Sequence, residues 1–177
     1  MKKTIDADGK KVDEASQIGA FRHTLWQATI ASKFGSMIAK EAGDAHEENP
    51  DTETGRGIYH VTALAHVDEK VDLSNNIIGR EIGEANPKLG MKDLAMKVLE
   101  IFKEEGLFTA TKTTLGKGAE VFIINRNKLS DEQYNQLKQL LSKLNNNGRT
   151  EEQQKASDEF WKKESERQDK QMKFLRG

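Results

Sequence analysis

The sequence predicts a mainly α-helical domain of the α+β class, with a small antiparallel β-hairpin and a polar C-terminal helix. Apolar residues recur at three- and four-residue steps through most of the chain, which is the helical period. Two β-rich runs flank a glycine-containing turn, and residues 150–177 are almost entirely polar. With 177 residues, 35% of them hydrophobic and 32% charged, the chain has the size of one domain with an appendage.

The composition excludes several classes of protein. The chain has no cysteine, so disulfides and thiolate metal sites are excluded. A net charge of −1 argues against a protein that coats nucleic acid widely. No apolar run approaches the ~18 residues of a membrane span. The charged stretch 1–11 has no hydrophobic segment, so we predict no secretory signal, and export would need another carrier.

The first part of the chain predicts a linker and two helices. Residues 1–14 are a polar lead-in or linker with a turn at Asp8-Gly9. From residue 15, Ile18, Phe21 and Leu25 follow the helical period until Gly35 interrupts it. A second helix is predicted over 36–46, with the side chain at position 36, a serine, as its N-cap.

The middle of the chain is less regular. Residues 48–57 have the composition of a loop, and the short apolar run 58–67 fits either a helix or a strand. Asp72 is a candidate N-cap for a helix that continues to about Glu84. Gly79 and Gly83 are poor helix formers one turn apart, which suggests close packing or close approach of a ligand.

The last elements have clear boundary signals. Residues 91–105 form an amphipathic pattern closed by a glycine at 106, and runs 107–111 and 120–124 predict strands within a hairpin over 107–125. Ser130 and Thr150 each open a capping box, the first for a helix to about residue 144. We therefore predict a helical domain over 15–148 and a polar helix over 149–177, which either docks through Phe160 and Trp161 or projects into solvent.

Three runs place polar side chains within apolar helical patterns: residues 21–28, 44–47 and 72–80. Because an imidazole ordinarily titrates near neutrality, His23 and His46 are candidates for a general base or a metal ligand. Ordinary alternatives are a core histidine for His23 and a surface pair with Glu47 for His46. If several of these side chains face inward, they must satisfy one another or bind a ligand. We predict that they form one site.

The third run offers amide and guanidinium groups. Asp72, Asn75 and Asn76 suit orienting an imidazole, binding a phosphate or sugar, or ligating a hard cation, and the alternative is an N-cap with an exposed asparagine pair. Arg80 suits a phosphate or carboxylate. We interpret His60 and His66 as structural. The residue types allow a zinc site from His23, His46 and Asp72, but no standard metal spacing supports it, so the metal and cofactor stay undetermined, with a divalent ion compatible.

The same three runs, taken in order, resemble a family of toxin domains. Its pattern is F-R-H-x-x-W-x-A, then D-A-H-E, then D-L-x-N-N-x-x-G-R, and the chain carries FRHTLWQA, DAHE and DLSNNIIGR at positions 21–28, 44–47 and 72–80. The chain thus resembles the helical domain found at the C-terminal ends of large bacterial polymorphic toxins, of the Rhs and filamentous-haemagglutinin (contact-dependent growth inhibition) types. The resemblance covers roughly residues 15–145. The link over 48–71 is longer here than in that family.

The resemblance implies an antibacterial effector domain, secreted as part of a larger protein, delivered to the target cytoplasm and neutralised by a cognate immunity protein. For its chemistry we expect hydrolysis of a phosphoester, with a nuclease favoured. His23 or His46 would act as the base beside Glu47, Arg80 would stabilise the anionic transition state, and Asp72 would orient groups. Substrate contacts are expected from four side chains: Arg22, Trp26, Asn75 and Asn76. The alternatives are an envelope hydrolase acting on lipid or peptidoglycan, and a non-enzymatic interaction or membrane-perturbing module.

Overall fold

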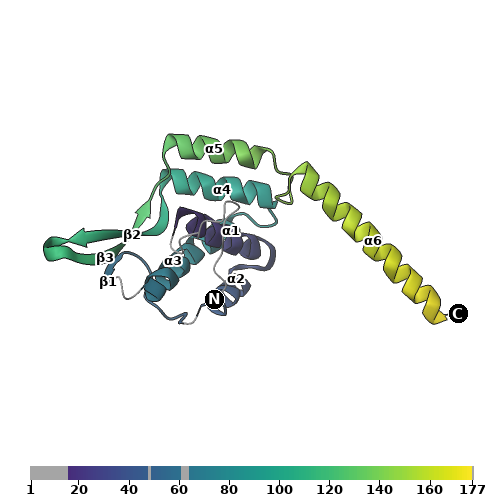
Figure 1. Cartoon of the computed structure of the whole chain (residues 1–177), viewed down its shortest axis with the longest axis horizontal. Coiled ribbons are helices and arrows are strands. Elements are labelled where there is room, and N and C mark those ends of the chain that lie inside the picture. Colours follow the sequence, from purple (N-terminus) through teal and green to yellow (C-terminus); the bar gives the residue numbers. More distant parts are fainter. Residues whose placement is uncertain (1–15, 48, 61–63, 177) are drawn as a thin grey trace.

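The computed structural model describes residues 16–47, 49–60 and 64–176, and it is mainly α-helical with a small antiparallel sheet, as predicted (Figure 1). The first 15 residues, which include the predicted lead-in, lie outside the described residues. The elements in chain order are α1 (Gln17–Phe34), α2 (Ser36–Asp44), β1 (Gly57–His60), α3 (Leu64–Ala85), α4 (Met91–Glu104), β2 (Leu107–Leu115), the short 3-10 turn η2 (Gly116–Gly118), β3 (Ala119–Asn127), α5 (Asp131–Ser142) and α6 (Glu151–Arg176).

Helices α1 and α3 cross at very short range, and two glycines allow it. A Cβ on Gly79 would lie 2.3 Å from the backbone oxygen of Thr24, and one on Gly83 would lie 2.3 Å from that of Ala28. Any side chain at either position would push the two helices apart. Of the two alternatives that the sequence left open for this glycine pair, close packing or close approach of a ligand, the structure shows close packing.

Helix α3 begins well before the predicted start. Asp72 is buried in the middle of a helix that starts at Leu64, so its prediction as an N-cap is wrong. Of the apolar run 58–67, residues 58–60 belong to β1 and residues 64–67 to the first turn of α3, while 61–63 lie outside the described residues. The early turns of α3 form because Val67 and Val71 bury their side chains against Ile124 of the sheet.

The sheet has three antiparallel strands in the order β1-β3-β2. Both hairpin strands are longer than predicted, and β1 adds to the far side of β3, where Tyr59 pairs with Phe122. Asn75 of α3 fastens the free edge of β2: its Nδ2 donates to the Phe108 carbonyl at 2.8 Å, and its Oδ1 accepts from the Phe108 amide at 2.9 Å. The sheet is thereby fixed to the helix that carries Asp72.

Helix α2 is shorter than predicted. Gly35, with φ at 90°, is its N-cap in place of the predicted Ser36, and the helix ends at Asp44. His46 and Glu47 consequently lie in the turn that follows, where their side chains are not held in a helical register.

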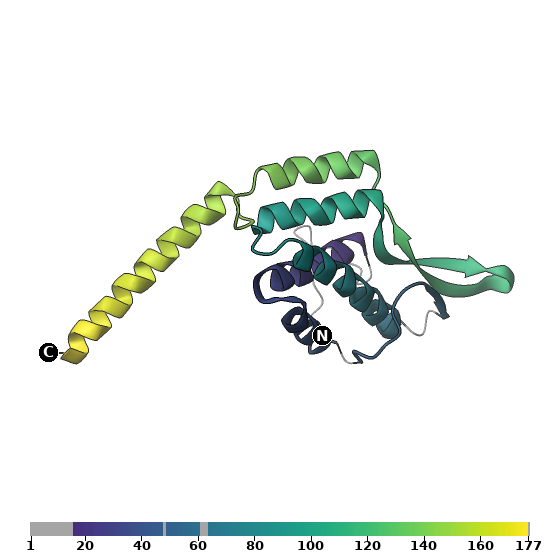
Figure 2. The same cartoon turned by 180° about the vertical axis from the view of Figure 1, so that it is seen from behind.

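The C-terminal elements match their sequence signals closely. Both capping boxes are present, with Ser130 Oγ accepting from the Gln133 amide and Thr150 Oγ1 accepting from the Gln153 amide, each at 3.2 Å. Helix α5 packs beside α4, whereas α6 extends away from the other helices (Figures 1 and 2). Its aromatic residue Trp161 is 63% exposed, so α6 projects rather than docks. Among the described helices, none is long and apolar enough to cross a membrane.

Candidate active site

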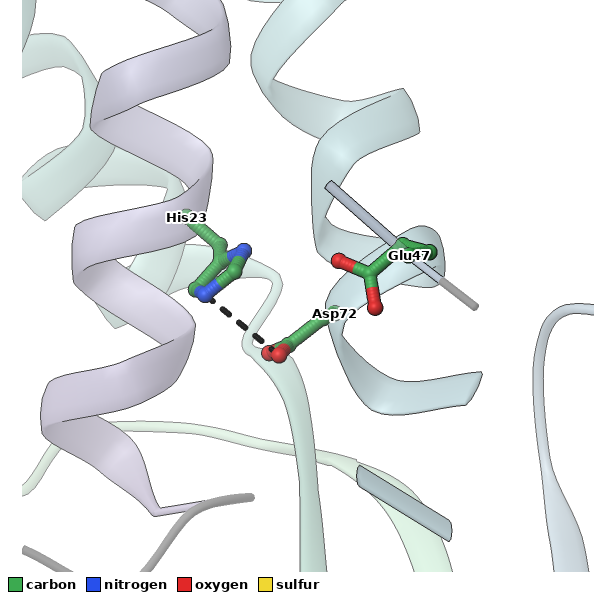
Figure 3. A group of neighbouring side chains, drawn as sticks. All are labelled: His23, Glu47 and Asp72. Atoms are coloured by element: carbon green, nitrogen blue, oxygen red, sulfur yellow. Dashed lines mark ion pairs between the residues drawn. The ribbon is translucent and has the colours of Figure 1, made fainter. Parts of the chain in front are cut away.

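One residue from each of the three sequence runs meets at the junction of α1, α2 and α3 (Figure 3). His23 comes from α1, Glu47 from the turn after α2, and Asp72 from the middle of α3. One potential ligand atom from each lies within 4.8 Å of the other two. Residues separated by more than a third of the helical domain's sequence therefore share one small volume.

His23 and Asp72 form the buried part of this group. His23 Nε2 lies 3.3 Å from Asp72 Oδ2, and the two residues are 4% and 9% exposed. The close crossing at Gly79 brings α3 near enough to α1 for this contact. The pairing answers the sequence question about His23: its ring lies in the core, but its Nε2 faces a carboxylate rather than a backbone carbonyl.

The long link after Glu47 returns along α3. The Asn49 amide donates to Glu69, the Thr52 hydroxyl donates to the same carboxylate at 3.2 Å, and the Gly55 amide donates to Ser74 Oγ at 2.9 Å. These contacts hold the link against the helix that carries Asp72. The extra length that distinguishes this chain from the toxin pattern thus leaves the second and third runs side by side.

Burial lowers the pKa of His23 from 6.5 to about 4. The charges of Arg22 and His46 lower this pKa further, while the neighbouring Asn76 side chain opposes the shift. A cation on the ring would have to lose its hydration in a nearly dry site. The His23 imidazole is consequently neutral at physiological pH, the form that can ligate a metal.

Burial also raises the pKa of Glu47 from 4.5 to about 7, and the charges of Glu69 and Asp68 raise it further. Asp68 lies one helical turn before Asp72 and is 7% exposed. Carboxylates thus gather on one side of His23, where a proton or a cation would relieve their mutual repulsion.

His46 and Trp26 form the more exposed side of the site. The ring of His46 lies 5.9 Å from that of His23 and 5.6 Å from that of Trp26, measured between centroids. Trp26 also meets His23 edge-on at 6.2 Å and is 36% exposed. The two histidines predicted to share a site are therefore neighbours, with His46 at its solvent side.

Two guanidinium groups approach the site from different directions. Arg22 Nη2 lies 3.4 Å from His23 Nε2, and its side chain is exposed. Arg80 Nη1 donates to Gln27 Oε1 at 3.4 Å, one helical turn beyond His23, and burial lowers the pKa of Arg80. Arg22 is thus the guanidinium nearer the His23–Asp72 pair.

The two neighbouring asparagines have different surroundings. Asn75 binds the backbone of β2 and lies outside the group around His23. Asn76 is fully buried beside His23, yet neither of its amide atoms reaches hydrogen-bond geometry with any described residue. Its Nδ2 would lie 3.2 Å from a Cβ on Gly43, so the end of α2 closes over it. Of the pair, Asn76 is the one that belongs to the site.

Two buried residues at the site escaped the sequence analysis. Asp68 was passed over because the helix was predicted to start at Asp72; a helix starting earlier places positions 68 and 72 on one face. Gln27 is fully buried, and its Nε2 has no partner among the described residues. Its spacing of four from His23 was a signal, but glutamine is ordinarily a surface residue in helices. The other two histidines, His60 and His66, are not in this group.

The arrangement suits two kinds of chemistry. A carboxylate that is half protonated near neutrality can exchange protons with a substrate or with water. One imidazole and two carboxylates can also hold a divalent ion while leaving positions open for water. Both require water or substrate to reach the centre from the side of Trp26 and His46.

Comparison with known proteins gives one match. The family model described as "Domain of unknown function (DUF6973)" matches residues 1–106, the stretch that contains all three runs. No curated protein and no solved structure matches the chain.

Proposed function

The chain belongs to the DUF6973 family, a domain of unknown function, and from the geometry of its candidate site we propose that it is a phosphoester hydrolase serving as an antibacterial toxin effector. The hydrolytic centre is the group of His23, Glu47 and Asp72. The effector is the terminal part of a larger secreted protein, acts in the target cytoplasm, and is neutralised by a cognate immunity protein.

One observation carries the proposal: each of the three toxin-like runs contributes one chemically competent side chain to the same volume, within 4.8 Å. A helical scaffold needs no such arrangement, because burying polar groups together costs free energy. The convergence therefore supports a site selected for chemistry, and the order of the runs supports the toxin context.

In the proposed reaction, the group of His23, Glu47 and Asp72 binds a water molecule and accepts its proton. The water oxygen forms a bond to phosphorus while the bond from phosphorus to the leaving oxygen breaks, giving a phosphomonoester and an alcohol. Exposed His46, beside the centre, donates a proton to the leaving oxygen. Arg22, the guanidinium nearer the centre, stabilises the charge that develops on the phosphoryl oxygens, while Arg80 contacts Gln27 one helical turn along α1.

A nucleic acid is the favoured substrate, because exposed Trp26 beside His46 offers a surface on which a base can stack. The net charge of −1 favours a second candidate, an envelope hydrolase acting on lipid or peptidoglycan, since such an enzyme needs no wide basic surface. The two candidates differ in the compartment where the toxin must act.

Inducible expression in Escherichia coli tests both candidates. The chain is produced either in the cytoplasm or with an added export signal, and colony counts are taken with total RNA and DNA profiles. We expect loss of viability from the cytoplasm with degraded nucleic acid, and full rescue by His23→Ala. His66→Ala is the matched control, because this exposed histidine of α3 lies outside the group at the centre and meets the Tyr59 ring edge-on.

Killing from the periplasm alone, with intact nucleic acid, would support the envelope hydrolase. Killing that persists in a folded His23→Ala variant would exclude hydrolysis at this centre and leave the non-enzymatic alternative.

A further inference from the structure

The orientation of the His23 ring limits what the imidazole can do. Its Nδ1 is buried and has no hydrogen-bond partner among the described residues, while Nε2 faces Asp72. A histidine that serves as a base from Nδ1 would need a path to substrate, which burial of that atom removes. The nitrogen available for chemistry is therefore Nε2, which faces Asp72.

The spacing of the three groups fits ligands of one ion. Two ligands about 2.1 Å from a tetrahedral Zn²⁺ lie about 3.4 Å apart, and Nε2 lies 3.3 Å from Asp72 Oδ2. One ligand atom of Glu47 lies within 4.8 Å of a ligand atom of each of the other two residues, so Glu47 reaches ligand distance by a small shift of its side chain. Glu47 can do so because it belongs to a turn rather than a helix.

Asn76 gives an independent indication. It is fully buried, makes no hydrogen bond of good geometry with any described residue, and lies beside His23. A histidine that ligates through one ring nitrogen usually donates its other N–H to a neighbouring acceptor. With Nε2 on an ion, the proton resides on Nδ1, and the Asn76 side chain beside His23 carries an unmatched carbonyl oxygen that can accept it.

We propose that His23, Glu47 and Asp72 bind one divalent transition-metal ion, best matched by Zn²⁺, and that Asn76 orients the His23 ring. Three protein ligands leave a fourth position for water, the arrangement used by catalytic zinc sites. Arg22 is exposed and turns away from Nε2 when the ion binds. Binding of the ion stands independently, while its use to activate water rests on the proposed hydrolase function.

Isothermal titration of the full chain with ZnCl2, after treatment with a chelator, tests the binding, and MnCl2 and MgCl2 provide parallel titrations. We expect one Zn²⁺ per chain. Asp72→Asn and Glu47→Gln should each weaken binding by about 100-fold, and Asn76→Leu by about 10-fold. His46→Gln is the matched control: this neighbouring histidine lies outside the ligand group, so affinity should change by less than about threefold.

X-ray absorption at the zinc edge provides a readout that does not depend on activity. We expect it to show one imidazole ligand, with oxygen atoms as the other ligands of the zinc. Circular dichroism establishes whether each variant is folded. If the buried substitution Asp72→Asn fails to fold, Glu47→Gln still decides the test. Absence of saturable binding, or equal binding by wild type, Glu47→Gln and Asp72→Asn, would overturn the metal site.

The two proposals fail in different ways. In one outcome, killing needs His23 and the purified protein still hydrolyses its substrate in excess chelator. This outcome would exclude the ion and retain the hydrolase. Stoichiometric Zn²⁺ binding by a chain that neither kills nor hydrolyses nucleic acid would retain the site and remove the proposed function.

Discussion

The two halves of this molecule treat polar side chains in opposite ways. Among the described residues, twelve polar or charged side chains are buried, and eleven of them belong to residues 16–85; the other is Thr109. From residue 91 onward, Thr109 is the one buried polar residue among those described, and α5 has a capping box and no buried residue. The difference teaches that the α1–α2–α3 junction carries polar burial that folding alone does not require.

The cost of that burial is visible in unmatched groups. His23 Nδ1 and Gln27 Nε2 lack partners among the described residues, and each such group costs about 1–3 kcal/mol. The junction must therefore gain stability elsewhere, and the close crossing of α1 with α3 supplies it. Four experiments can break or sharpen this contrast.

The largest effect should come from the helix crossing. We expect the double substitution Gly79→Ala and Gly83→Ala to lower the free energy of unfolding by about 4 kcal/mol, because each new Cβ meets a backbone oxygen of α1. Urea denaturation followed by circular dichroism measures it. Gly19→Ala is the control: this buried helical glycine meets its nearest atom at 3.7 Å, so the helix should gain up to about 1 kcal/mol.

If the double variant were as stable as Gly19→Ala, the crossing would tolerate side chains. The crossing of α1 and α3 would then not be what offsets the cost of burying polar groups at the junction.

The next effect concerns pH. The pKa of His23 is about 4 in the folded chain against 6.5 when unfolded, so the unfolded chain binds more protons between these values. Stability contributed by neutral His23 is present above pH 6.5 and falls by about 3 kcal/mol as the pH drops to 4. Glu47, with its pKa raised to about 7, acts oppositely: its contribution is present below pH 4.5 and is lost as the pH rises to 7.

The two contributions oppose each other in the wild type, so the variant Glu47→Gln exposes that of His23. In chelator, its unfolding free energy should fall between pH 6.5 and 4 by about 3 kcal/mol more than that of the double variant with His23→Gln. The neighbouring charges remain in both variants: Arg22, His46 and Asp72 beside the ring, and Asp68 and Glu69 beside position 47. If the two variants had parallel pH profiles of unfolding free energy, His23 would have the same pKa in the folded and the unfolded chain.

A smaller effect separates the two asparagines. Asn75→Ala should cost about 2 kcal/mol, because it leaves the Phe108 amide and carbonyl without their side-chain partner. Asn76→Leu should change stability by less than about 1 kcal/mol, since it removes an unmatched buried amide at similar volume. Thermal unfolding in chelator compares them. Equal losses would mean that Asn76 is structural in the same sense as Asn75.

The asparagine pair also shows how far sequence reasoning reaches. The helical pattern and capping signals predicted the class, the hairpin and both capping boxes, because these depend on local chemistry. They could not tell Asn75 from Asn76, since the difference arises from which face of α3 meets β2. The start of α3 was misplaced because Asp72 is a good N-cap in isolation, while burial of Val67 and Val71 against the sheet is a tertiary effect.

The convergence of His23, Glu47 and Asp72 has the same character. The three runs were recognisable in sequence, and the polar residues within them could be nominated. Their meeting in one volume depends on the crossing of α1 and α3 at the glycines and on the link held by Glu69. The spacing of apolar residues along the sequence predicts neither of these contacts. The family match to residues 1–106 covers the polar junction and leaves α5 and α6 outside.

The smallest effect should follow removal of the projecting helix. Deleting residues 159–177 keeps the contacts that hold the start of α6, where Asn145 donates to Gln154 at 3.1 Å and Arg149 donates to Ser157 at 2.9 Å. The removed segment includes exposed Trp161, so little buried surface is lost, and we expect a change below about 0.5 kcal/mol in urea denaturation. Zn²⁺ affinity should also be unchanged, because the ion's proposed ligands lie in the other half. A loss above about 2 kcal/mol would mean that α6 packs on the body in solution, and the contrast between a polar junction and an ordinary C-terminal half would need to be redrawn.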